Sequence, residues 1–132
     1  MANALYPKGK KAVLDGAALL SSDIRFMLVD TADETYNAAD QYVTDITSAG
    51  IVARMAAGLA SKTTTDGTFD AADPTINAVT GDSVEAVVLY KYNASDAAAE
   101  LLAWIDSSPS IAFTPNGSNV TLTLDAAGIF SI

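Results

Sequence analysis

The apolar residues of this chain fall into short runs, each about as long as one β-strand, and turn-forming residues separate the runs. Residues 24–30 are apolar at nearly every position, which is typical of a strand covered on both faces. Residues 85–92 and 100–106 flank the loop NASDAAA and predict two antiparallel strands, although the leucines and alanines of the second also suit a helix. Such a pattern favours an antiparallel β-fold over alternating β and α units.

The closing stretch carries the most regular strand pattern of the chain. Val120, Leu122 and Leu124 alternate with threonines, so one face of this stretch is expected in the core. A Pro-Asn-Gly turn at residues 115–117 leads into it. The apolar pattern continues to Ile132, and two interpretations stay open: the end forms the last strand of its own sheet, or it is buried against a neighbouring subunit.

Weaker patterns lie between these segments. Residues 51–57 and 75–79 each predict a strand, whereas residues 31–46 favour a helical turn or an irregular loop. The lysines near the start are interrupted by Pro7 and Gly9 and precede any periodic element, which predicts an extended segment.

Together these patterns predict one domain over residues 1–132, with an extended N-terminal arm at 1–12 and a β-rich body at 13–132. The expected fold class is mainly β: an antiparallel β-sandwich or barrel of the jelly-roll type, with one or two short helices.

The composition removes most enzymatic chemistry. The chain has no cysteine and no histidine, so it lacks thiolate ligands, the usual general base and the middle member of a Ser-His-Asp arrangement. Its 16 acidic and 7 basic residues give a formal charge of −9, which argues against binding to phosphate backbones. We expect no enzymatic activity, no cofactor, no nucleic-acid partner and no membrane span. The start of the sequence lacks a secretory signal, so we expect synthesis in the cytoplasm without export.

Two patterns of acidic residues could indicate a functional site, the first catalytic and the second for a metal ion. Asp30 in LVDTAD and Asp106 in WIDSSP each follow an apolar strand, as in proteases with paired aspartates, but both lack the glycine that should come next, so we interpret them as turn residues. Asp66, Asp70 and Asp73 supply oxygen ligands that suit calcium. Their spacing matches no EF-hand loop, and a solvated acidic loop is the alternative.

Three of the seven basic residues are clustered near the N-terminus: Lys8, Lys10 and Lys11. On so acidic a chain, such a cluster suits docking to an acidic partner, with Tyr6 and Pro7 adding contact area. The alternative is a hydrated, mobile arm, because charged runs are usually solvated.

Several segments together resemble a family of small proteins encoded by tailed bacteriophages. They are MANALYPKGKKAVLDG, IRFMLVDTADETYNAADQYVTDI, GDSVEAVVLYK, AELLAWID and FTPNGSNVTLTLDAAGIFSI. The resemblance covers nearly the whole chain and rests on overall pattern and order, without a catalytic signature.

The resemblance implies a virion structural protein, in the first place a capsid decoration or cement protein that sits on the capsid surface. Its partners would be the major capsid protein and further copies of itself, as a homotrimer at threefold positions. Candidate contacts, taken from the physical character of this sequence, are Tyr6, Pro7, Lys8, Lys10, Lys11, Ile129, Phe130 and Ile132.

Two alternatives accompany this expectation. One is a component of the tail, neck or fibre. The other is a host-surface or carbohydrate-binding module that would use aromatic residues as stacking platforms. The aromatic candidates are Tyr36, Tyr42, Tyr90, Tyr92 and Trp104.

Overall fold

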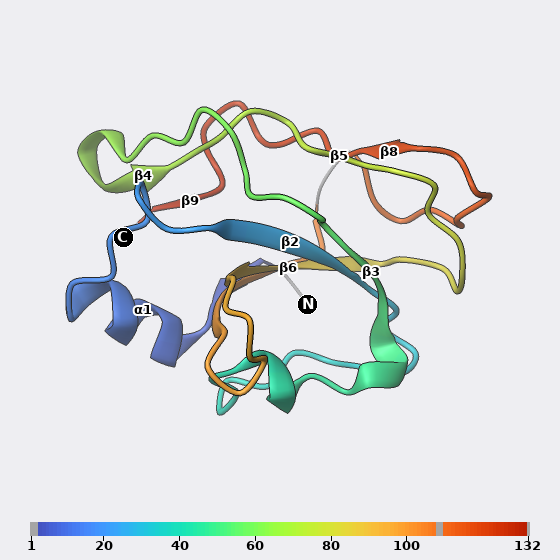
Figure 1. Ribbon diagram of the computed structural model, residues 1–132, viewed down its shortest axis with the longest axis horizontal. Coiled ribbons are helices and arrows are strands. Elements are labelled where there is room, and N and C mark those ends of the chain that lie inside the picture. Colours follow the sequence, from blue (N-terminus) through green and yellow to red (C-terminus); the bar gives the residue numbers. More distant parts are fainter. Residues whose placement is uncertain (1–2, 108–109, 132) are drawn as a thin grey trace.

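A five-stranded antiparallel sheet forms the centre of the protein (Figure 1). The computed structural model describes residues 3–107 and 110–131. The strands follow the order β1-β7-β6-β2-β3, and every neighbouring pair is antiparallel. Their bounds are Ala4–Leu5 for β1, Ile24–Val29 for β2, Ile51–Arg54 for β3, Ala86–Lys91 for β6 and Glu100–Ile105 for β7.

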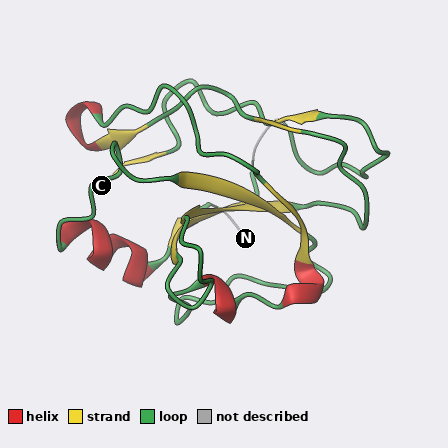
Figure 2. Cartoon of the chain, viewed as in Figure 1, coloured by secondary structure: helices red, strands yellow, loops and turns green. Residues whose placement is uncertain are grey.

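One face of the sheet is covered by a layer of loops and two small ribbons (Figures 1 and 2). The ribbons pair β4 (Thr68–Phe69) with β9 (Phe130–Ser131) and β5 (Thr75–Ile76) with β8 (Val120–Thr121). A short 3₁₀ turn, η3 (Thr65–Gly67), precedes β4. This layer is not one continuous sheet, and the five-stranded sheet is open, ending at β1 and β3. The described residues therefore form a mainly β fold but no closed barrel.

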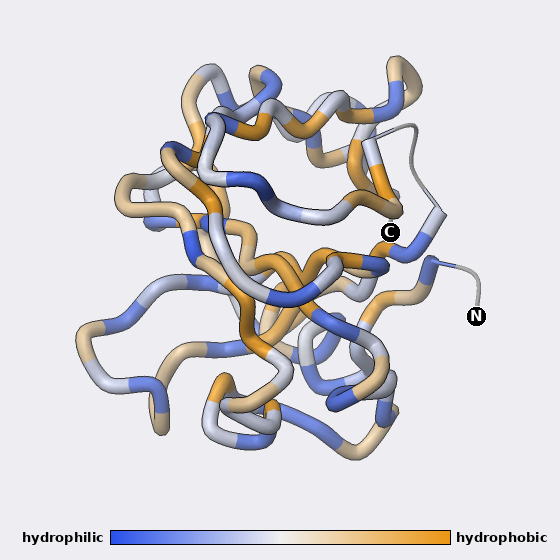
Figure 3. Tube along the Cα trace, turned by 90° about the vertical axis from the view of Figure 1, so that its right-hand side faces the viewer, coloured by the Kyte–Doolittle hydropathy of each residue, from blue (hydrophilic) through white to orange (hydrophobic). Residues whose placement is uncertain are grey.

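The opposite face is covered by residues 31–50, which include the 3₁₀ turns η1 (Val43–Asp45) and η2 (Ser48–Gly50). Successive residues of β2 face opposite layers: Phe26 belongs to the core cluster under the ribbons, and Met27 to the cluster under residues 31–50. Because both faces are covered, the central strands are apolar at nearly every position. Figure 3 shows these hydrophobic segments in the middle of the molecule.

The predicted strands of the central sheet are confirmed. The segments 24–30, 85–92 and 100–106 contain β2, β6 and β7, and the third is a strand, not a helix. Residues 31–46 are irregular apart from η1, as expected. The segments 51–57, 75–79 and 120–124 contain only shorter strands, β3, β5 and β8.

The prediction of an extended arm is wrong for residues 7–12, which belong to helix α1 (Pro7–Leu14). Pro7 occupies the first turn, where a proline needs no hydrogen-bond partner and its fixed φ suits a helix. Gly9 is buried against the backbone of Leu101 and Leu102 in β7. The glycine that looked like a helix breaker in the sequence is therefore the point at which the helix contacts the sheet.

Candidate functional site

Helix α1 carries three lysines around its exposed side, and we call this set the lysine face. It consists of Lys8, Lys10 and Lys11, all of which are exposed. Lys8 Nζ donates a hydrogen bond to the carbonyl oxygen of Ala39 at 3.0 Å, and Lys11 pairs with Asp15. Leu14, at the end of the helix, is 75% exposed. The lysines therefore lie on an ordered helix beside an exposed apolar side chain, and Pro7 is also exposed at its start.

Tyr6, in contrast, points into the protein. Its backbone N–H donates to Leu102 O at 3.0 Å, its side chain is fully buried, and its ring lies 5.1 Å from that of Tyr36. Burial raises the pKa of Tyr6, and its hydroxyl has no hydrogen-bond partner among the described residues. The expectation that Tyr6 adds contact area for a partner is therefore wrong, because the apolar ring anchors α1 to the core.

Carboxylates gather where β2 ends, β6 begins and β7 ends. Asp30 follows β2, and its Oδ1 accepts a hydrogen bond from the N–H of Ala32 at 2.9 Å. Asp106 follows β7, and its Oδ2 accepts one from Nε1 of Trp104 at 3.1 Å. Both residues therefore end strands, as predicted for turn residues. Because β2 and β7 each pair with β6, the fold brings these distant segments to one end of the sheet.

A pocket of about 330 Å³ opens at this end, and we call it the acidic-aromatic pocket. It is lined by Thr31, Thr35, Tyr36, Glu85, Trp104 and Asp106. The rings of Tyr36 and Trp104 meet nearly edge to face, with centroids 6.1 Å apart. Glu85 and Thr31 are 54 positions apart, so no local motif could have indicated the pocket.

Glu85 is held in a fixed position at the edge of this pocket. Its Oε1 accepts hydrogen bonds from the backbone N–H and the hydroxyl of Thr31, at 3.1 and 3.2 Å. A hydrogen bond from Ser83 is the largest cause that lowers the pKa of Glu85, and the bonds from Thr31 add to it. Glu85 is therefore a stable negative charge at neutral pH.

Three carboxylates also come together next to the pocket. Oxygen atoms of Asp30, Asp33 and Asp82 lie within 4.8 Å of one another, with Asp30 buried and the other two exposed. The ion pairs among the described residues join Lys11 to Asp15, Arg25 to Asp23 and Arg54 to Asp96. None of these pairs neutralises the three carboxylates.

The three aspartates considered as calcium ligands, Asp66, Asp70 and Asp73, do not come together in the same manner. Asp70 Oδ1 accepts a hydrogen bond from the N–H of Ala71 at 2.8 Å, whereas Asp73 Oδ1 accepts one from the N–H of Leu124 at 3.0 Å. Asp66 is exposed in η3. Within residues 3–107 and 110–131, these three carboxylates do not form a cluster that could hold a metal ion.

Two further acidic side chains are buried near Tyr6. Glu34 accepts a hydrogen bond from the N–H of Thr47. Burial, together with the negative charges of Asp45 and Glu34, raises the pKa of Asp40 to about 6. The charge of Lys8 acts in the opposite direction. Asp40 is therefore a carboxyl group that titrates above its usual range.

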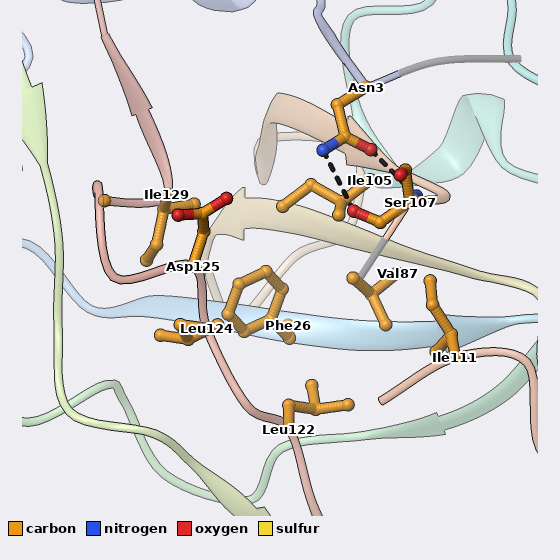
Figure 4. A pocket seen from close by; sticks show the side chains of 11 residues that line it. Asn3, Phe26, Val87, Ile105, Ser107, Ile111, Leu122, Leu124, Asp125 and Ile129 are labelled. Atoms are coloured by element: carbon orange, nitrogen blue, oxygen red, sulfur yellow. Dashed lines mark hydrogen bonds between the residues drawn. The ribbon is translucent and has the colours of Figure 1, made fainter. Parts of the chain in front are cut away.

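A smaller cavity of about 50 Å³ lies between the sheet and the ribbon layer (Figure 4). Phe26, Val87 and Leu122 point into it, and the amide of Asn3 closes one side by hydrogen bonding to Ser107 (Figure 4). Its lining is largely apolar, and its volume is close to that of one or two water molecules. We interpret it as a packing gap of the core.

The C-terminal segment is paired within its own chain. Phe130 stacks on Phe69 with ring centroids 5.4 Å apart, and the N–H of Ile129 donates to Phe69 O at 2.8 Å. Ile129 and Phe130 are half-buried against the core. Of the two interpretations of this segment, the structure shows the strand of its own sheet for Phe130–Ser131, while Ile132 lies outside the described residues.

The aromatic residues considered as stacking platforms are mostly committed to packing. Tyr90 and Trp104 are buried. Tyr92 is 39% exposed, but the guanidinium of Arg25 lies 3.7 Å from its ring centroid. Tyr36 and Tyr42 are half-buried. The structure therefore brings only Tyr36 and Trp104 together at a pocket.

No protein-family model matches the chain, and a search of curated proteins finds no match. Among the described helices, none combines the length and the apolar character needed to cross a membrane.

Proposed function

We propose that this protein is a virion structural protein, a capsid decoration protein that binds the outside of a phage head and bridges subunits of the major capsid protein. The resemblance of the sequence to small proteins of tailed phages motivates the proposal. The observation that carries it is the lysine face of α1, an ordered basic surface on a strongly acidic domain.

The packing of α1 makes this surface suitable for docking. Gly9 lets the helix lie directly on β7, and the buried ring of Tyr6 holds its start. The backbone that carries the lysines is therefore already ordered before binding, so its ordering adds no entropic cost to association. The exposed side chain of Leu14 offers an apolar contact in addition to the charges of the lysines.

Each exposed ion pair with a shell protein would be weak, of the order of 1 kcal/mol or less. Repetition compensates for this weakness, because a closed trimer makes each contact three times and a head offers many equivalent positions. We therefore propose a homotrimer on the virion surface, in which the central sheet and its ribbon layer act as a sandwich-like spacer and α1 faces the shell.

The test is binding of the purified protein to expanded heads that lack it, measured by co-sedimentation over a range of salt concentrations. We expect saturable binding that weakens with salt, and a loss of roughly tenfold or more in affinity for the double variant Lys10→Gln, Lys11→Gln. The matched control is Lys62→Gln, Lys91→Gln, which removes the same charge elsewhere and should bind normally.

Failure of the wild-type protein to bind heads would overturn the proposal. Gold labelling of intact virions separates it from the alternative of a tail, neck or fibre component, since that alternative predicts label away from the head.

A further inference from the structure

We propose that the acidic-aromatic pocket binds a protonated alkylamine, the chemical group found in free diamines and at the end of a lysine side chain. This proposal concerns a different surface from the lysine face and does not depend on the function proposed above.

The lining of the pocket has the chemistry that an ammonium group requires. Glu85 and Asp106 provide carboxylates, and Thr31 and Thr35 provide hydroxyl groups that can accept hydrogen bonds. Tyr36 and Trp104 line the remaining side of the pocket with aromatic carbon, against which methylene groups can pack. No basic side chain is among the lining residues, so an incoming cation meets no competitor there.

Hydrogen bonds within the protein hold the carboxylates of the pocket in position before a ligand binds. Two hydrogen bonds from Thr31 hold Glu85 in place, and one from Trp104 holds Asp106. Asp33 and Asp82, which belong to the neighbouring cluster with Asp30, add to the negative potential. A preorganised site of this kind loses little free energy to reorganisation when a cation binds.

The size and shape of the pocket select among ligand classes. With a volume of about 330 Å³, the pocket has room for an alkyl chain with a charged head and is larger than a bare metal ion needs. A sugar needs an open aromatic face for stacking, but Trp104 is only 2% exposed. Anions are repelled by the carboxylates. An alkylammonium ion satisfies the charge, the hydroxyl groups and the apolar wall together.

The single tryptophan of the chain makes the proposal directly testable, because Trp104 lines the pocket and its Nε1–H is bonded to Asp106. The experiment titrates the full-length protein with 1,4-diaminobutane and, separately, with Nα-acetyl-lysine N-methylamide. Indole N–H chemical shift and tryptophan fluorescence are the two measurements. Neutral controls are 1-butanol and Nα-acetyl-norleucine N-methylamide.

We expect saturable changes with the amines and none with the neutral compounds. The variant Glu85→Gln retains an oxygen that can accept the bonds from Thr31 but loses the charge, and it should bind amines at least roughly tenfold more weakly. Asp66→Asn, which removes one exposed charge elsewhere, is the matched control and should bind normally.

Binding of the lysine derivative would indicate a protein side chain as the natural source, and binding of the diamine alone would indicate a free amine; both support the site. The proposal is overturned if neither amine gives a saturable change, if the neutral compounds give the same change, or if Glu85→Gln binds as well as the wild type. Near-ultraviolet circular dichroism of the variant establishes that a loss of binding does not reflect unfolding.

Discussion

Gly9 of α1 and Leu101 of β7 lie so close together that a β-carbon on Gly9 would sit 2.5 Å from the carbonyl oxygen of Leu101. The obstacle is backbone inside the central sheet, so it cannot move aside as a side chain can. Gly9→Ala should therefore lift α1 from β7 and lower the free energy of unfolding by about 1–3 kcal/mol. Urea unfolding measures this loss.

The control for this prediction is Lys10→Ala, an exposed change in the same helix that should alter stability by less than about 0.5 kcal/mol. Equal stability of Gly9→Ala and the wild type would contradict the close contact between helix and sheet.

The buried hydroxyl of Tyr6 has no partner among the described residues, so its removal should not cost a hydrogen bond. We expect Tyr6→Phe to leave stability unchanged or to raise it by about 1 kcal/mol. Tyr36→Phe is the matched comparison, because the hydroxyl of Tyr36 donates to Leu5 O at 3.3 Å and its loss should destabilise the protein. Thermal denaturation of both variants gives the answer, and a clear destabilisation by Tyr6→Phe would show that its hydroxyl is bonded in solution.

Asp40 should make the protein less stable as the pH rises. Its pKa is raised to about 6 in the folded protein, compared with about 3.9 in an unfolded chain. Ionisation is thus less favourable in the folded state, and the contribution of this group to stability falls between about pH 4 and pH 6.

The variant Asp40→Asn cannot ionise, so it should be more stable than the wild type at pH 7 by on the order of 1 kcal/mol, and this difference should disappear near pH 4. Urea unfolding at four pH values tests this, with Asp66→Asn as an exposed control. A difference that does not change with pH would rule out the raised pKa.

Gly128 is constrained both by its backbone conformation and by a close neighbour, and comparison with Gly16 separates the two effects. The φ of Gly128 is +110°, and a β-carbon there would clash with Cγ2 of Thr68 in β4. Gly16 has the same φ with no atom nearby. Gly16→Ala should therefore cost only the backbone strain, of the order of 1 kcal/mol, whereas Gly128→Ala should cost more because it also pushes β9 from β4. Chemical denaturation compares the two, and equal losses would mean that Thr68 moves aside freely.

The central strands could be predicted because burial on both faces requires apolar residues at nearly every position, as in Ile24–Val29. The first and last residues of the ribbon strands could not be predicted in this way. Strands of two residues, such as Val120–Thr121, are too short to show an alternation of apolar and polar residues.

Helix α1 was missed for a different reason. Proline, glycine and lysines within eight residues indicate a broken segment, and only the tertiary contact of Gly9 with β7 explains why a glycine is favourable there. The acidic-aromatic pocket was missed because its residues come from the ends of three separate strands. Their convergence depends on the strand order, which the sequence does not display.

The pairing of β1 with β7 also delays completion of the sheet during synthesis of the chain. Ala4 lies opposite Trp104, so the first strand has no partner until about one hundred further residues have been synthesised. At 5–20 residues per second this takes roughly 5–20 s. During that interval the edge of the growing sheet and the ring of Tyr6 are unprotected. Assembly of this protein in the cell therefore depends on how well that waiting period is tolerated.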